Sequence, residues 1–175
     1  MTATDLFPAR FDKLGMKRNW AECAEHLLED AYPQFAADVA PGDFLVVDGT
    51  VGSGHAHYFG AAVMSCREVG LSAVLATNVN GMFFRSATDL GLKVWTFPEL
   101  MPLVESGHQL ELDLDAALAS NMTTGVTARL TPVPELIQEI FSAGGTTAWA
   151  KSRPEVLART RAHRESLSNA EPLQI

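Results

Sequence analysis

The chain has 175 residues, of which 47% are hydrophobic and 19% charged, so it can build one packed domain. Its 13 Lys and Arg against 21 Asp and Glu give a net charge of −8, which argues against a surface made for nucleic acid or anionic lipid. No apolar run reaches the roughly 20 residues that a membrane span needs, and the amino terminus does not resemble a secretory signal. We expect a cytoplasmic protein that binds neither nucleic acid nor membrane.

The first half of the chain predicts alternating helices and strands. Residues 19–31 have the apolar spacing of an amphipathic helix, with Asn19 as its N-cap. Beyond it, short apolar runs alternate with helical patterns that stop at Gly70 and Gly91. The order is a strand at 44–47, a glycine-rich loop at 49–54, a helix at 58–69, a strand at 71–76, a helix at 79–90 and a strand at 92–97. This order is typical of a layered α/β unit with parallel strands.

The second half predicts a different kind of sheet. Residues 109–114 alternate between apolar and polar, which indicates a strand with one face in water. A turn at 121–125 and a return strand at 126–130 follow, and then a helix over 134–142 that ends at Gly144. Residues 151–175 form a charged tail in which a helix is expected after Pro154.

Four segments in this order resemble the small subunit of 3-isopropylmalate dehydratase, the swivelling domain of the aconitase family. The first is the strand at 41–49, and the second is the strand at 71–76 with the helix that contains Met82-Phe83-Phe84-Arg85-Ser86-Ala87. The third is 107–114, and the fourth is the turn and helix within 121–145. The resemblance implies an α/β fold, a swivelling β/β/α three-layer domain of the aconitase C-terminal-domain type, over residues 1–150, followed by the tail at 151–175.

The resemblance also implies a function shared between two chains. The family's large subunit holds a [4Fe–4S] cluster, and the pair moves a hydroxyl between neighbouring carbons of an organic acid by dehydration and rehydration. We therefore expect a large, cluster-bearing partner, a small hydroxy-dicarboxylic acid as substrate, and no cofactor in this chain. Cys23 and Cys66 agree with that division, because two isolated cysteines do not make a set of cluster or zinc ligands.

The glycine-rich loop differs from the family pattern. The family reads Gly-Cys-Gly-Ser-Ser-Arg-Glu-His-Ala, whereas this chain reads Gly52-Ser53-Gly54-His55-Ala56-His57-Tyr58. When positions are counted from Gly42, Gly52-Ser53-Gly54 aligns with the family's Gly-Cys-Gly. When positions are counted back from Gly70, the family pattern aligns two residues later in this chain. Neither register matches the family's catalytic serine and arginine. Two hypotheses follow: a hydro-lyase subunit whose loop holds the substrate, or a binding or regulatory subunit on the same scaffold that does not catalyse.

The replaced loop still has chemistry suited to an acid. Backbone N–H groups at the start of a helix favour a carboxylate, so we assign substrate binding to Gly52, Ser53 and Gly54. His55 or His57 is a candidate base or cation near neutral pH, and in an extended loop the two side chains point to opposite sides. The alternative for both is a structural role at the helix start and contact with a partner. A metal site lacks a third ligand, so none is predicted.

The resemblance adds three residues outside the loop. The segment Thr4–Phe11 is similar to a family segment around the active site, which makes Asp5 a catalytic candidate and Arg10 a substrate-binding one. The alternative for Asp5 is a frayed terminal residue. Arg85 matches a family position and is assigned to a substrate carboxylate, with bracing of its helix against an acidic neighbour as the alternative.

Overall fold

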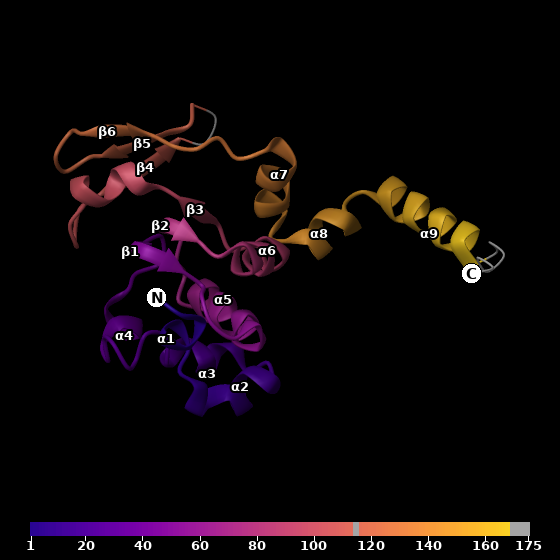
Figure 1. Ribbon diagram of the computed structural model, residues 1–175, viewed down its shortest axis with the longest axis horizontal. Helices are drawn as coiled ribbons and strands as arrows, with labels where there is room; N and C mark the ends of the chain where they lie inside the picture. The colour runs from indigo at the N-terminus through magenta and orange to yellow at the C-terminus, as the bar shows by residue number, and fades with distance from the viewer. Residues whose placement is uncertain (114–115, 169–175) are drawn as a thin grey trace, which may run out of the picture.

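The computed structural model describes residues 1–113 and 116–168. In these residues the strands form a parallel sheet and an antiparallel sheet, each with three strands (Figure 1). The parallel sheet has the order β1-β2-β3 and consists of Phe44–Val51, Ala73–Val79 and Val94–Thr96. The antiparallel sheet has the order β4-β5-β6 and consists of Leu110–Asp113, Leu118–Asn121 and Thr127–Arg129. The predicted α/β layering with parallel pairing is confirmed.

Helices cover one face of the parallel sheet and the antiparallel sheet lies over the other (Figure 1). The described α-helices are α1 (Ala3–Leu6), α2 (Asp12–Met16), α3 (Trp20–Glu25), α4 (Phe35–Asp38), α5 (Phe59–Glu68), α6 (Gly81–Leu90), α7 (Glu135–Ala143), α8 (Thr146–Lys151) and α9 (Pro154–Ser168). Short 3₁₀ helices are η1 (Ala9–Phe11), η2 (Ala56–Tyr58) and η3 (Pro98–Leu103). In the described part of the chain, every helix is too short or too polar to cross a membrane.

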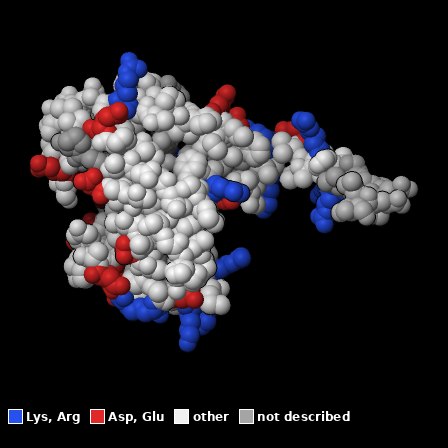
Figure 2. All heavy atoms as spheres, viewed as in Figure 1, with Lys and Arg blue, Asp and Glu red and all other residues white. Residues whose placement is uncertain are grey.

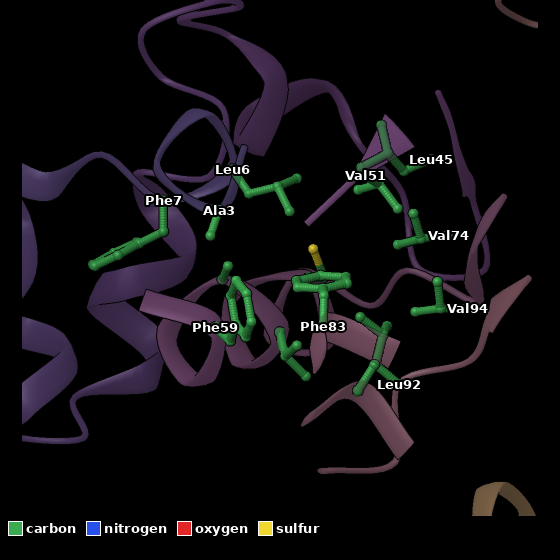
Figure 3. Packing of buried hydrophobic residues seen from close by; sticks show 14 of the residues in the cluster. Ala3, Leu6, Phe7, Leu45, Val51, Phe59, Val74, Phe83, Leu92 and Val94 are labelled. Carbon is green, nitrogen blue, oxygen red and sulfur yellow. The ribbon is translucent and has the colours of Figure 1, made fainter. Parts of the chain in front are cut away.

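The three layers follow from the alternation of side chains along β2. Val74 and Ala76 lie in the core between the sheet and the helices, whereas Ala73 and Leu75 lie in the core between the two sheets. Successive residues of a strand point to opposite faces, so a strand covered on both faces has a continuous apolar run. Figure 3 shows the first of these cores, where Phe59 and Phe83 meet edge to face with their ring centres 5.5 Å apart.

The surface charge is unevenly distributed. Figure 2 shows basic side chains along the projecting α9 and at the end of the molecule formed by the amino-terminal helices, with acidic side chains spread over the body. Residues 154–168 extend away from the two sheets in Figure 1, and none of residues 154–164 belongs to either core.

The structure differs from the sequence prediction at two elements. The helix expected over 19–31 ends at Glu25, because Leu28 adopts a left-handed conformation, with φ of 58°, and donates its N–H to the Leu6 carbonyl at 2.8 Å. Leu27 and Leu28 are buried nonetheless, so the apolar spacing identified buried residues but not the turn. Strand β5 was not predicted, since its four residues are too few for a clear alternation; the return strand β6 pairs with β5.

Gly52 sits where β1 leaves the sheet, directly over the side chain of Phe83 on α6. Its φ of 79° lies in the left-handed region, and a methyl group added at its Cα would overlap the buried Phe83 ring. Both the backbone conformation and the close approach therefore require glycine at this position.

We predict that Gly52→Ala destabilises the protein by about 3 kcal/mol or more, because strain in the left-handed region and overpacking against Phe83 add to each other. Gly60→Ala is the matched control, since Gly60 lies in α5 with no atom within 4 Å of an added methyl group. The control is expected to be neutral or to gain up to about 1 kcal/mol from helix propensity. Urea denaturation of both variants measures the difference, and equal free energies of unfolding would contradict the prediction.

Candidate functional site

The predicted loop lies at the carboxyl edge of the parallel sheet, where it connects the end of β1 to η2 and α5. Helix α6 begins at the same edge, because Asn80 donates its N–H to the Val51 carbonyl at 3.0 Å. The Asn80 side chain caps α6 by accepting from the N–H groups of Met82 and Phe83. Ligands of open α/β sheets bind outside the carboxyl ends of the strands, so this edge is the candidate site.

The amino-terminal residues hold the loop in place. The terminal ammonium of Met1 donates to the Thr50 carbonyl at 2.8 Å, and the Gly52 N–H donates to the Met1 carbonyl at 3.1 Å. Ala3 then donates its N–H to the Ser53 carbonyl at 2.9 Å. The backbone of the loop is therefore fixed by strand-like pairing with the first residues of the chain.

Asp5 is ordered beside this pairing, so its interpretation as a frayed terminal residue is wrong. Its carboxylate accepts from the Thr2 N–H at 2.6 Å, and its own N–H donates to the Thr2 hydroxyl at 3.0 Å. This reciprocal capping box fixes the start of α1. The carboxylate thus anchors the segment that supports the loop, and its catalytic role stays a prediction.

His55 and His57 are both exposed, and their imidazole ring centres lie 6.0 Å apart. The expectation that they point to opposite sides is wrong, because the chain turns into η2 over Ala56–Tyr58 instead of staying extended. The His57 ring also contacts the Tyr58 ring at 3.8 Å between centres. The structure therefore brings two imidazoles together above the start of α5.

Backbone N–H groups of the loop are available to a ligand. In the part of the chain that the structure describes, no acceptor bonds the N–H groups of Gly54, His55 and Ala56. These residues are exposed, and they line neither of two hollows that lie at the layer between the sheets. The loop is thus an open platform for an anion, and enclosing a ligand there requires a second surface.

Arg10 is engaged within the protein and is not brought to the loop as a free cation. Its guanidinium pairs with Glu29 at 2.7 Å and with Asp30, and these hydrogen bonds raise the pKa of Arg10. The Arg10 guanidinium lies over the Phe11 ring, 4.5 Å from its centre. The His26 ring stacks on the Phe11 ring, with 3.6 Å between the two ring centres. His26 and Arg10 also bond Glu29 and hold its pKa below the usual value. The substrate-binding prediction for Arg10 is therefore not supported by its contacts.

Arg85 lies on the exposed face of α6. Phe83 and Ala87 are fully buried, and Arg85 is two residues from each, which puts it on the opposite side of the helix. None of the described residues forms an ion pair with it, so the predicted alternative of bracing against an acidic neighbour is not seen. Arg85 lies on the helix that starts beside the loop, and its guanidinium is available to the carboxylate of a ligand.

The cysteines do not fit a metal cluster. Cys23 and Cys66 are fully buried, and burial raises the pKa of the Cys66 thiol to about 12. Metal ligation needs the thiolate, which such burial disfavours. Within residues 1–113 and 116–168, no three His, Cys, Asp or Glu side chains are grouped to hold a metal ion.

Comparison with known proteins identifies relatives at about one third identity. The chain is 33% identical over 132 residues to the 3-isopropylmalate dehydratase small subunit of Thermodesulfovibrio yellowstonii, a match that covers 75% of this chain and 77% of the relative. It is 33% identical over 149 residues to small subunit 2 of Archaeoglobus fulgidus, covering 85% and 87%. The relative from Nautilia profundicola is 35% identical over 130 residues, covering 74% and 76%. No family model matches the chain.

The fold is also that of a solved relative. The crystal structure of 3-isopropylmalate dehydratase from Methanocaldococcus jannaschii superimposes with a TM-score of 0.77 over 91% of both chains, at 23% identity. This match confirms the predicted swivelling β/β/α three-layer fold. The aligned regions cover at least 74% of this chain and at least 76% of each of these relatives. The chain therefore belongs to the family of 3-isopropylmalate dehydratase small subunits.

Proposed function

We propose that this chain is the small subunit of a heteromeric hydro-lyase that dehydrates or isomerises a hydroxy-dicarboxylic acid related to 3-isopropylmalate. One observation carries the proposal: relatives named as small subunits of 3-isopropylmalate dehydratase match about three quarters of this chain and of their own length. The name of these relatives implies a large subunit, which would be the partner of this chain.

The open loop supports a shared site. Dehydration of a hydroxy acid needs a substrate held away from bulk water, but the loop at residues 52–57 lies largely on the surface of this chain. A large subunit that closes over the carboxyl edge of the parallel sheet would supply the missing wall. A [4Fe–4S] cluster would belong to that partner, because the buried thiols of this chain do not fit as ligands.

The residues of this chain have two roles in the proposal. The free N–H groups at Gly54, His55 and Ala56 would hold a substrate carboxylate, with Arg85 as an additional cation. An imidazole of the His55–His57 pair would take or give a proton near neutral pH. Histidine would thus do what the serine does in the family pattern, where a guanidinium and backbone N–H groups stabilise the alkoxide.

Co-expression tests the partnership. When this full chain is produced with the large subunit from its own genome, we expect the two to co-purify as a brown complex that contains iron. The complex is expected to form with the loop variants as well, since the loop backbone is held by residues 1–3. A colourless chain that never associates with the large subunit would contradict the proposal.

Replacement of a loop histidine tests the chemistry. In the co-purified complex, His57→Ala should lower kcat by about 100-fold or more while KM changes less, because general acid–base catalysis contributes about 10²–10⁴. His163→Ala is the matched control, since His163 lies on α9, away from the loop in Figure 1. If an active complex keeps its full turnover in both His57→Ala and His55→Ala, the histidine role is wrong and the partner supplies the base.

A further inference from the structure

A groove opens between the two sheets at the amino edge of the parallel sheet. It has a volume of about 180 Å³ and is lined by Phe44, Ser72, Ala73, Lys93, Trp95 and Leu112. Phe44 and Ala73 begin β1 and β2, and Lys93 directly precedes β3. The loop of the candidate site follows the other end of β1, about 20 Å away at the rise of an extended strand. The groove is therefore separate from the site described above.

The groove contains a cation without a counter-ion. Lys93 and Trp95 are two residues apart, so their side chains lie on the same face of the sheet, toward the antiparallel layer. Lys93 is half-buried, and no described residue forms an ion pair or side-chain hydrogen bond with its ammonium. None of the described residues that line the groove carries a carboxylate. A half-buried ammonium without a partner favours the binding of an anion.

Trp95 contributes its aromatic ring to the wall of the groove. Its side chain is 4% exposed, and its indole Nε1–H is buried without an acceptor in the described residues. The Nε1 atom is closed to a water molecule, so it does not face the open space of the groove. A second hollow that touches Trp95, lined also by Leu130 and Pro132, has no room for a water molecule. Of these two hollows, the groove beside Lys93 is the one with room for a ligand, and the Trp95 ring forms part of its wall.

We infer that this groove is a binding site for a small aliphatic carboxylate. The carboxylate would lie between the Lys93 ammonium and the Ser72 hydroxyl, and its short apolar part would lie against the rings of Phe44 and Trp95 and the side chain of Leu112. The volume is that of about six water molecules, which is room for a ligand of a few carbon atoms. Binding of such an acid here would be independent of the proposed chemistry at the loop.

Titration of the full chain with butyrate, followed by ¹H–¹⁵N NMR, tests the site. The indole N–H resonance of Trp95, assigned by its loss in Trp95→Phe, should shift saturably with a dissociation constant in the millimolar range. Butyramide, which has the same shape without the charge, should leave the resonance unmoved. Lys93→Gln should weaken butyrate binding by about tenfold or more, because it removes the one full charge among the described residues that line the groove.

Lys17→Gln is the matched control, because Lys17 lies at the end of α2, outside the groove. It should bind butyrate as the unmodified chain does, and the dispersion of each spectrum shows whether the variant is folded. The inference is overturned if the Trp95 resonance does not saturate, if butyramide shifts it equally, or if Lys93→Gln binds normally. Shifts confined to the amides of Gly52 and Gly54 would place the anion at the loop and would also overturn the groove site.

Discussion

Burial of both faces of the parallel sheet is the constraint on which the rest of this structure depends. Strand β2 has no exposed face over Ala73–Ala76, so it needs a layer of helices on one side and a second sheet on the other. The hydrophobic effect acts on both faces at once, and neither core forms without the sheet. The position of every other element, including the loop after β1, is set relative to this strand.

The loop shows how a rigid sheet presents an exposed functional segment. Gly52 passes over the buried ring of Phe83, the first residues of the chain pair with the loop backbone, and Asn80 ties the start of α6 to Val51. The backbone is thus held from three directions while the imidazoles and several N–H groups stay open to solvent. Such an arrangement suits a domain that completes a site on another chain, because the geometry of the loop is fixed in advance and one wall of the site is left for the other chain to supply.

The two edges of the parallel sheet differ in character. The carboxyl edge carries backbone N–H groups, two histidines and the start of α6, and it is open. The amino edge is partly covered by the antiparallel sheet and combines one lysine with aromatic and aliphatic side chains. Both edges favour an anion. The carboxyl edge offers backbone N–H donors in water, whereas the amino edge offers the charge of a half-buried lysine, where a lower effective dielectric constant strengthens each contact.

Local patterns determined much of this protein from the sequence alone. The apolar runs, the glycines that end α5 and α6, and the turn at Asn121–Gly125 are short-range signals, so the order of elements and the family could be predicted. Contacts between distant residues could not. The engagement of Arg10 by Glu29, the pairing of residues 1–3 with the loop and the groove at Lys93 all join segments that meet only in the folded chain. The turn at Leu28 was missed for the same reason. The Leu28 N–H donates to the carbonyl of Leu6, and only the packing of the folded chain brings these two groups within 2.8 Å of each other.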